Sequence, residues 1–138
     1  MPGYNDSLIE QLRANGGAIA AGPMAGRPLL VLTTTGARTG MSREAVLTFT
    51  RDGDRYVVAG TAGGSPTTPA WVHNVAANPV VLVEAKGRRF RARGTIVNDA
   101  KRRRLWDAHV AERPEFAEYP ERSGRTIPVI TLEPITEA

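Results

Sequence analysis

Residues 33–44, which read TTTGARTGMSRE, combine side chains and turn residues that could bind a negatively charged group. Gly36 and Gly40 relax the backbone, and exposed N–H groups in such a turn can form an anion-binding concavity. Arg38 and Arg43 bracket the turn with permanently charged, bidentate donors that suit phosphate or carboxylate. The pattern therefore indicates an anion site, and a plain hairpin turn is the alternative.

Other kinds of site are excluded by the residues that this sequence offers. His73 and His109 are the only histidines, lie far apart and have no cysteine beside them, so the spacing of metal ligands is missing. No G-x-S-x-G segment supplies an acyl-transfer nucleophile. The segment GTAGG at 60–64 leads into Ser-Pro-Thr-Thr-Pro instead of a helix, which argues against a dinucleotide-binding loop.

The net charge of +4 favours an anionic partner without identifying it. Arg89, Arg91 and Arg93 share one face of a predicted strand, a pattern that is typical of a solvated outer face. Nucleic-acid binding would need stacking aromatic side chains among these arginines, and Phe90 is the only one there. We therefore expect no nucleic-acid partner.

The sequence also bears on the compartment of the protein. It contains no cysteine, which suits a reducing environment. No segment approaches the run of about 18 apolar residues of a membrane helix, and residues 1–17 lack the apolar core of a signal peptide. We expect a cytoplasmic protein without an integral membrane segment, and peripheral contact of its N-terminal helix with a membrane stays open.

These functional residues must be positioned by a mainly β fold. Strands are predicted in apolar, β-branched segments at 29–35, 43–51, 55–61, 80–85, 89–97 and 127–133. Helices are predicted at 6–15, at 69–78, from Asn98 or Asp99 to Pro114, and in a short piece near 115–122. Asp-Gly at 52–53 and the turn at 86–88 predict hairpins.

The short turns favour antiparallel pairing, and a small antiparallel sheet tends to close into a barrel that removes its edges. The predicted fold class is therefore mainly β (α+β), a six-stranded antiparallel barrel with peripheral helices. Its predicted division is an N-terminal helix and connector at 1–27 and the barrel at 28–138.

Several motifs follow one another in an order that resembles a known family. After TTTGARTGMSRE come RDGDR, AGG and PAWVHNVAANP, and the last strand lies in RTIPVITLEP. From about residue 28 to residue 134 the chain resembles the deazaflavin-dependent nitroreductase family, whose members are split β-barrel proteins that bind coenzyme F420, an 8-hydroxy-5-deazaflavin. The resemblance implies the same split barrel and the same coenzyme.

The resemblance also implies individual cofactor contacts. Arg38 matches the basic residue that meets the anionic tail of the coenzyme, and Arg43 matches a second arginine on the phosphate side. The other implied cofactor-binding residues are Ala37, Thr39, Ala45, Val46, Leu47, Thr48, Ala59, Gly60, Thr61, Ala62, Trp71, Val72, His73, Asn74 and Phe116. Independently of the resemblance, Trp71 and Asn74 share a helix face, and His73 points elsewhere, as a surface or packing histidine would.

An oxidoreductase reaction follows from the resemblance. Reduced deazaflavin would deliver a hydride from its C5 to an electron-poor quinone, enone, unsaturated lactone or nitroaromatic. Nitroreductases carry tyrosines before the last strand, where this chain has Arg113, Phe116 and Tyr119, so only Tyr119 keeps a hydroxyl. Thr61 and Tyr119 are the predicted catalytic residues, which would orient the substrate or donate a proton, and solvent is the alternative proton donor.

Two alternatives stay open at this point. Flavin mononucleotide would suit the arginine-bracketed turn equally well, because the split barrel hosts both cofactors. A carrier that binds deazaflavin without catalysis is the second. The expected partner is a small-molecule hydride acceptor, and the expected assembly is a monomer or a homodimer.

Overall fold

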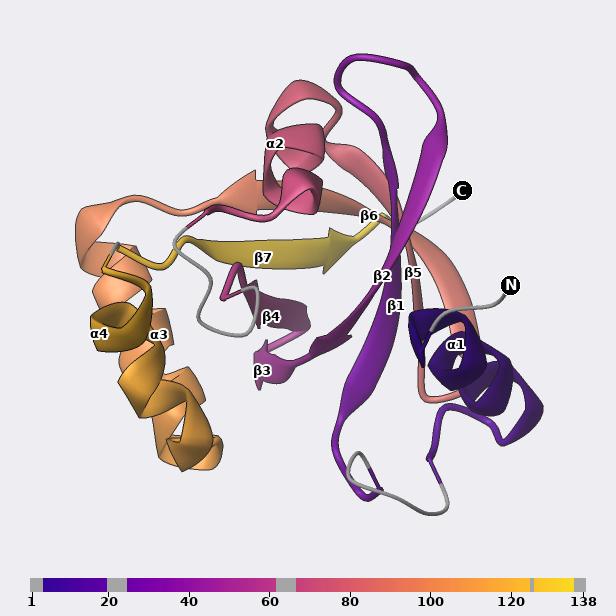
Figure 1. The fold of residues 1–138 in the computed structure, drawn as a ribbon, viewed down its shortest axis with the longest axis horizontal. Helices are drawn as coiled ribbons and strands as arrows, with labels where there is room; N and C mark the ends of the chain where they lie inside the picture. The colour runs from indigo at the N-terminus through magenta and orange to yellow at the C-terminus, as the bar shows by residue number, and fades with distance from the viewer. Residues whose placement is uncertain (1–3, 20–24, 62–66, 125, 136–138) are drawn as a thin grey trace.

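Residues 4–19, 25–61, 67–124 and 126–135 are described by a computed structural model, drawn in Figure 1. Its helices are α1 (Tyr4–Ala14), α2 (Ala70–Ala77), α3 (Asp99–Glu112), the 3-10 helix η2 (Pro114–Glu118) and α4 (Tyr119–Ser123). Its strands are β1 (Leu29–Thr35), β2 (Ser42–Thr48), β3 (Thr50–Asp52), β4 (Arg55–Ala59), β5 (Val80–Ala85), β6 (Arg88–Ile96) and β7 (Val129–Pro134).

The strands form one sheet in the order β2-β1-β5-β6-β7-β4-β3, and each neighbouring pair is antiparallel. The hairpins predicted from Asp-Gly at 52–53 and from the turn at 86–88 are confirmed as the β3–β4 and β5–β6 turns. Gly53 has φ 60°, and Lys86 and Gly87 have φ 51° and 76°. These positive angles are those of tight hairpin turns, which match the right-handed twist of the strands.

The sheet curls into a half-barrel, and a single residue of the chain joins its two edge strands. β2 and β3 stand at opposite ends of the strand order, and Phe49 is the one residue between them in the chain. Phe49 is 3% exposed, and its N–H donates a hydrogen bond to the Pro28 carbonyl at 2.9 Å. The antiparallel barrel is thus confirmed, but with seven strands, because the predicted strand 43–51 breaks where the chain passes between edges.

Alternating side chains give the sheet an inner and an outer face. The interior is filled from the strands by residues such as Leu30, Val83 and Ile130, and α2 adds Trp71 and Val75. Outside, the helices cover two separate areas, α1 over β1 and α3 over β4 and β7. Figure 1 shows α1 and α3 at opposite ends of the molecule. None of the helices in the described ranges is long and apolar enough to span a membrane.

Two glycines bring α2 close to the sheet. A Cβ on Gly94 of β6 would lie 2.6 Å from Cγ1 of Val75, and a Cβ on Gly60 would lie 2.8 Å from Cγ2 of Val72. Contacts shorter than 3 Å would displace the helix or its side chains. Glycine at these positions therefore sets how α2 sits beside the β1–β2 turn, which is the place of the predicted site.

Candidate functional site

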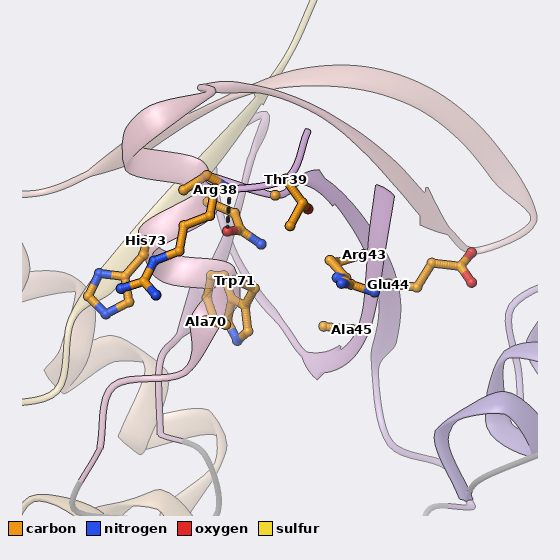
Figure 2. A pocket seen from close by; sticks show the side chains of 11 residues that line it. Arg38, Thr39, Arg43, Glu44, Ala45, Ala70, Trp71 and His73 are labelled. Atoms are coloured by element: carbon orange, nitrogen blue, oxygen red, sulfur yellow. Dashed lines mark hydrogen bonds between the residues drawn. The ribbon is translucent and has the colours of Figure 1, made fainter. Parts of the chain in front are cut away.

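A cavity of about 730 Å³ lies between the β1–β2 turn and α2, within the size range of cofactor pockets (Figure 2). The predicted cofactor-binding residues on its wall are Ala37, Arg38, Thr39, Arg43, Ala45, Trp71, His73 and Asn74. The wall also contains three residues that were not among the predicted contacts, Gly36, Glu44 and Ala70. The structure thus gathers most of the turn motif and one side of α2 around one space.

The β1–β2 turn is closed by its own backbone bonds. The Gly36 N–H donates to the Met41 carbonyl at 2.8 Å, and the Gly40 N–H donates to the Gly36 carbonyl at 2.9 Å. Gly40 has φ 71°, in the left-handed region that favours glycine. The Met41 N–H donates to Oγ1 of Thr39 at 3.2 Å. Much of the predicted backbone concavity is therefore used by the turn itself, so its anion-binding capacity lies mainly in the arginine side chains.

Asn74 ties this turn to α2. Its Oδ1 accepts a hydrogen bond from the Ala37 N–H at 3.0 Å, and its Nδ2 donates to Oγ1 of Thr34 at 3.1 Å. Asn74 is 6% exposed, so both ends of its amide are satisfied within the protein. One turn later, Nδ2 of Asn78 donates to the Thr35 carbonyl at 3.3 Å. Asn74 and Trp71 share the buried helix face, as predicted, but the Asn74 amide orients the turn.

Arg38 and Arg43 are exposed, and neither forms an ion pair or a side-chain hydrogen bond within the described residues. By contrast, Arg55 contacts carboxylates of Asp52 and Glu133. Two unneutralised guanidinium groups on one cavity wall attract anions, because each charge-assisted contact with phosphate or carboxylate replaces water without first breaking an existing pair. The electrostatics of this wall therefore favour an acidic ligand group.

Glu44 lies next to Arg43, but an arginine outside the cavity neutralises its charge. Nη2 of Arg13 on α1 donates to Oε2 of Glu44 at 2.7 Å. In Figure 2 the Glu44 carboxylate lies beyond Arg43, on the side away from Trp71. The acid therefore borders the cavity without pairing with Arg43.

Another part of the wall is apolar. Trp71 is 9% exposed and belongs to the barrel core, and Ala45 packs against the same core. Ala70 adds a second small side chain beside the indole. Small residues beside an aromatic ring leave room for a planar ring system next to the charged turn. His73 is exposed, as a surface histidine would be, but it lies on the same cavity wall as Trp71 and Asn74.

Several residues that were predicted to contact the coenzyme do not line the cavity. Val46 packs against the α1 cluster and Leu47 against the barrel core. Val72 and Ala59 are each 5% exposed. Thr48 ends β2, Gly60 and Thr61 follow β4, and Ala62 lies outside the described residues. Roles for these positions toward a coenzyme stay predictions.

Phe116 and Tyr119 are also absent from this wall. The Phe116 ring is 7% exposed and stands edge-on to His109 on α3, with centroids 4.7 Å apart. Tyr119 packs edge-on against Phe116 at 5.2 Å, and the Arg122 guanidinium lies 5.7 Å from its ring centroid. The segment before β7 therefore forms an aromatic cluster with α3, and the predicted roles of both residues remain untested.

Of the wall residues outside the predicted contacts, Gly36 and Glu44 belong to the motif that the sequence singled out, and Ala70 immediately precedes Trp71. The motif itself was a signal for the first two. Ala70 carries no chemical signal, because only the path of α2 brings it to the cavity.

Known proteins are similar to this chain in sequence and in fold. An F420H(2)-dependent quinone reductase of Mycobacterium tuberculosis (strain ATCC 25618 / H37Rv) is 38% identical over 108 residues, which are 76% of this chain and 72% of that protein. The solved F420-H2 dependent reductase FDR-A matches with a TM-score of 0.70 and 32% identity over 78% of this chain and 95% of that chain. A structure described as a domain-swapped dimer matches with a TM-score of 0.72 and 29% identity over 92% and 95%.

A family model supports the same relationship over nearly the whole sequence. The model described as F420H(2)-dependent quinone reductase matches residues 7–134, which include most of α1 as well as the barrel. The resemblance found in the turn and α2 motifs is thereby confirmed, and the match identifies the related family as the quinone reductases. The chain belongs to the F420H(2)-dependent quinone reductase family.

Proposed function

We propose that this protein is an F420-dependent oxidoreductase that transfers a hydride from reduced F420 to a quinone-type acceptor. The observation that carries the proposal is the cavity between the β1–β2 turn and α2, in which Arg38 and Arg43 have no carboxylate partner among the residues that the structure describes. Its combination of positive turn and apolar wall suits a coenzyme with an acidic tail and a planar ring. Membership of the F420-dependent family favours F420 over flavin mononucleotide.

The residues of the cavity divide into three roles. Arg38 and Arg43 would hold the anionic tail through charge-assisted hydrogen bonds, each worth about 1.5–3 kcal/mol. Ala45 and Trp71 would contact the ring system from the apolar wall. Asn74 would act indirectly, because its amide is bonded to Thr34 and Ala37 and so fixes the turn that carries the arginines.

When bound, the reduced coenzyme supplies the hydride, and the chain supplies binding, orientation and exclusion of water. Thr61 stays the proposed hydroxyl for orienting the acceptor, because it is half-buried and lies just beyond β4. Tyr119 is the second candidate from the sequence, although its ring packs against Phe116. Proton delivery by solvent is the alternative to both.

A fluorescence titration of the purified protein with F420 and with flavin mononucleotide tests the cofactor assignment. We expect saturable binding of F420 and much weaker binding of the mononucleotide. Tight binding of the mononucleotide alone would overturn the proposal.

Turnover separates a reductase from a carrier. The absorbance of reduced F420 should decay when protein and a soluble quinone are both present, and enones, unsaturated lactones and nitroaromatics complete the panel. Binding of F420 without turnover on any acceptor would favour the deazaflavin carrier.

Location and assembly belong to the same proposal. The cysteine-free sequence supports a cytoplasmic site of action, with peripheral membrane contact as the alternative. A similar structure is described as a domain-swapped dimer, which supports testing a homodimer against a monomer. Light scattering on the eluting protein decides between these two states.

A further inference from the structure

We propose that Arg13 of α1 is a positioning residue for the anion site that acts through Glu44, because it neutralises the Glu44 carboxylate at the border of the cavity. The inference rests on the proposed function and adds a residue that lies outside the cavity wall. It links the docking of the N-terminal helix to the affinity of a site on the barrel.

Arg13 is held by two acids from two strands. Its Nε and Nη2 donate to the two carboxylate oxygens of Glu84 on β5, both at 2.8 Å, in a bidentate pair. The same Nη2 donates to Glu44 on β2 at 2.7 Å. The hydrogen bond from Arg13 is the main reason that the pKa of Glu84 lies below its ordinary value. Glu84 therefore fixes the position of the guanidinium, and Nη2 of the same guanidinium neutralises Glu44.

Apolar contacts fix the helix that carries Arg13. Leu8 and Leu12 of α1 are 4% and 5% exposed and pack with Leu29 and Val31 on the outer face of β1. Figure 1 shows α1 lying against this side of the sheet. The position of the guanidinium is thus set by the helix as a whole, so its pairing with Glu44 depends on the docked helix.

The consequence for the anion site is electrostatic. Glu44 borders the cavity and directly follows Arg43 in β2. The two side chains leave the strand on opposite faces, so Glu44 acts on the ligand through its charge and not by contact with Arg43. Without Arg13, an uncompensated carboxylate at the border of the cavity would repel an acidic ligand. With Arg13 in place, the positive charge of the wall is available to the ligand.

The test is a double-mutant cycle on F420 binding, measured by calorimetry with intact protein. Arg13→Ala should weaken binding about threefold to tenfold, the scale of one partly screened charge. Glu44→Gln should bind about as well as the wild type. The double variant Arg13→Ala/Glu44→Gln should regain the affinity of Glu44→Gln, because the offending charge is gone.

The matched control is Arg55→Ala, which removes an arginine that also contacts two acids, Asp52 and Glu133, but off the cavity wall. Its affinity should stay at the wild-type value. The loss in Arg13→Ala should also shrink in 0.5 M salt, a concentration at which surface charges about 5 Å apart are largely screened. A loss that Glu44→Gln does not rescue, or an unchanged Arg13→Ala, would overturn the inference.

A parallel titration with tripolyphosphate separates this inference from the proposed function. If the wild type binds tripolyphosphate but not F420, the proposed function fails, while a rescued loss in Arg13→Ala still supports the role of Arg13. If neither ligand binds, both proposals are overturned.

Discussion

At the scale of single residues, the candidate site depends on which charges are paired. Arg38 and Arg43 have no carboxylate partner in the described ranges, whereas Glu44 is paired with Arg13. The turn motif made the two arginines predictable, since glycines and arginines at this spacing exceed what a hairpin needs. The Arg13–Glu44 pair was not predictable, because 31 residues separate its members and only the docking of α1 brings them together.

Replacing Arg38 with alanine tests the contribution of one unpaired charge. We expect F420 binding to weaken about tenfold to a hundredfold, the loss of one charge-assisted contact. The measurement is a fluorescence titration at constant ionic strength.

Arg103→Ala controls for the change in net charge, because Arg103 is exposed on α3. Its affinity should match that of the wild type. If Arg38→Ala also binds normally, the opening motif is only a turn.

At the scale of elements, the site is a junction between a β-turn and a helix. The pattern PAWVHNVAANP predicted α2 and the shared face of Trp71 and Asn74, and both are confirmed. It could not assign the Asn74 amide, because the bond to Ala37 joins positions 37 residues apart. The close packing of α2 against Gly60 and Gly94 is also a tertiary contact, so the local sequence could not predict it.

Asn74→Ala should loosen this junction. The change leaves Thr34, which is 2% exposed, and the Ala37 N–H without their partner, so we expect a loss of about 1–3 kcal/mol in unfolding free energy. F420 binding should weaken as well, because the turn that carries Arg38 is no longer fixed. Urea unfolding and the F420 titration measure the two effects.

Asn78→Ala is the matched control, since it removes an amide at the C-terminal cap of the same helix, and the bond of that amide to Thr35 is exposed. Its effect on both measurements should be clearly smaller. Equal effects of the two variants would contradict a special role for Asn74.

At the scale of the whole molecule, one barrel carries covering helices on two separate outer areas. Hairpin turns and apolar segments made the antiparallel sheet predictable. The break at Phe49 was not predictable, because TFTR contains no turn residue and the break occurs where the chain passes from one edge of the sheet to the other.

Under α3, His109 is fully buried, and its Nδ1 lies 2.8 Å from Oγ1 of Thr50 on β3.

His109 should make the stability of the whole protein depend on pH. Burial, with the charge of Arg113, lowers the pKa of His109 to about 4 from its ordinary 6.5. Between these values the unfolded chain binds the proton and the native protein does not, so stability falls as pH falls. We expect a loss of about 2 kcal/mol in unfolding free energy between pH 7 and pH 5.

Denaturant unfolding at the two pH values measures this loss. His109→Leu should remove most of the pH dependence, while His73→Leu, which replaces an exposed histidine on α2, should retain it. A pH dependence that survives His109→Leu would assign the effect to other groups.

Only Phe49 connects β2 to β3, so this barrel should not tolerate the insertion or loss of a residue between these two strands. Loss of one residue here would shift β3 by one step and bring Arg51 to the place under α3 where Thr50 meets His109. A guanidinium there would lose its water without gaining a counter-charge. Insertions and deletions, natural or engineered, should therefore accumulate in the loops between the other strands and helices. The number of residues from Ala45 to Thr50 should stay constant, because it sets the position of the cavity wall relative to the strands under α3.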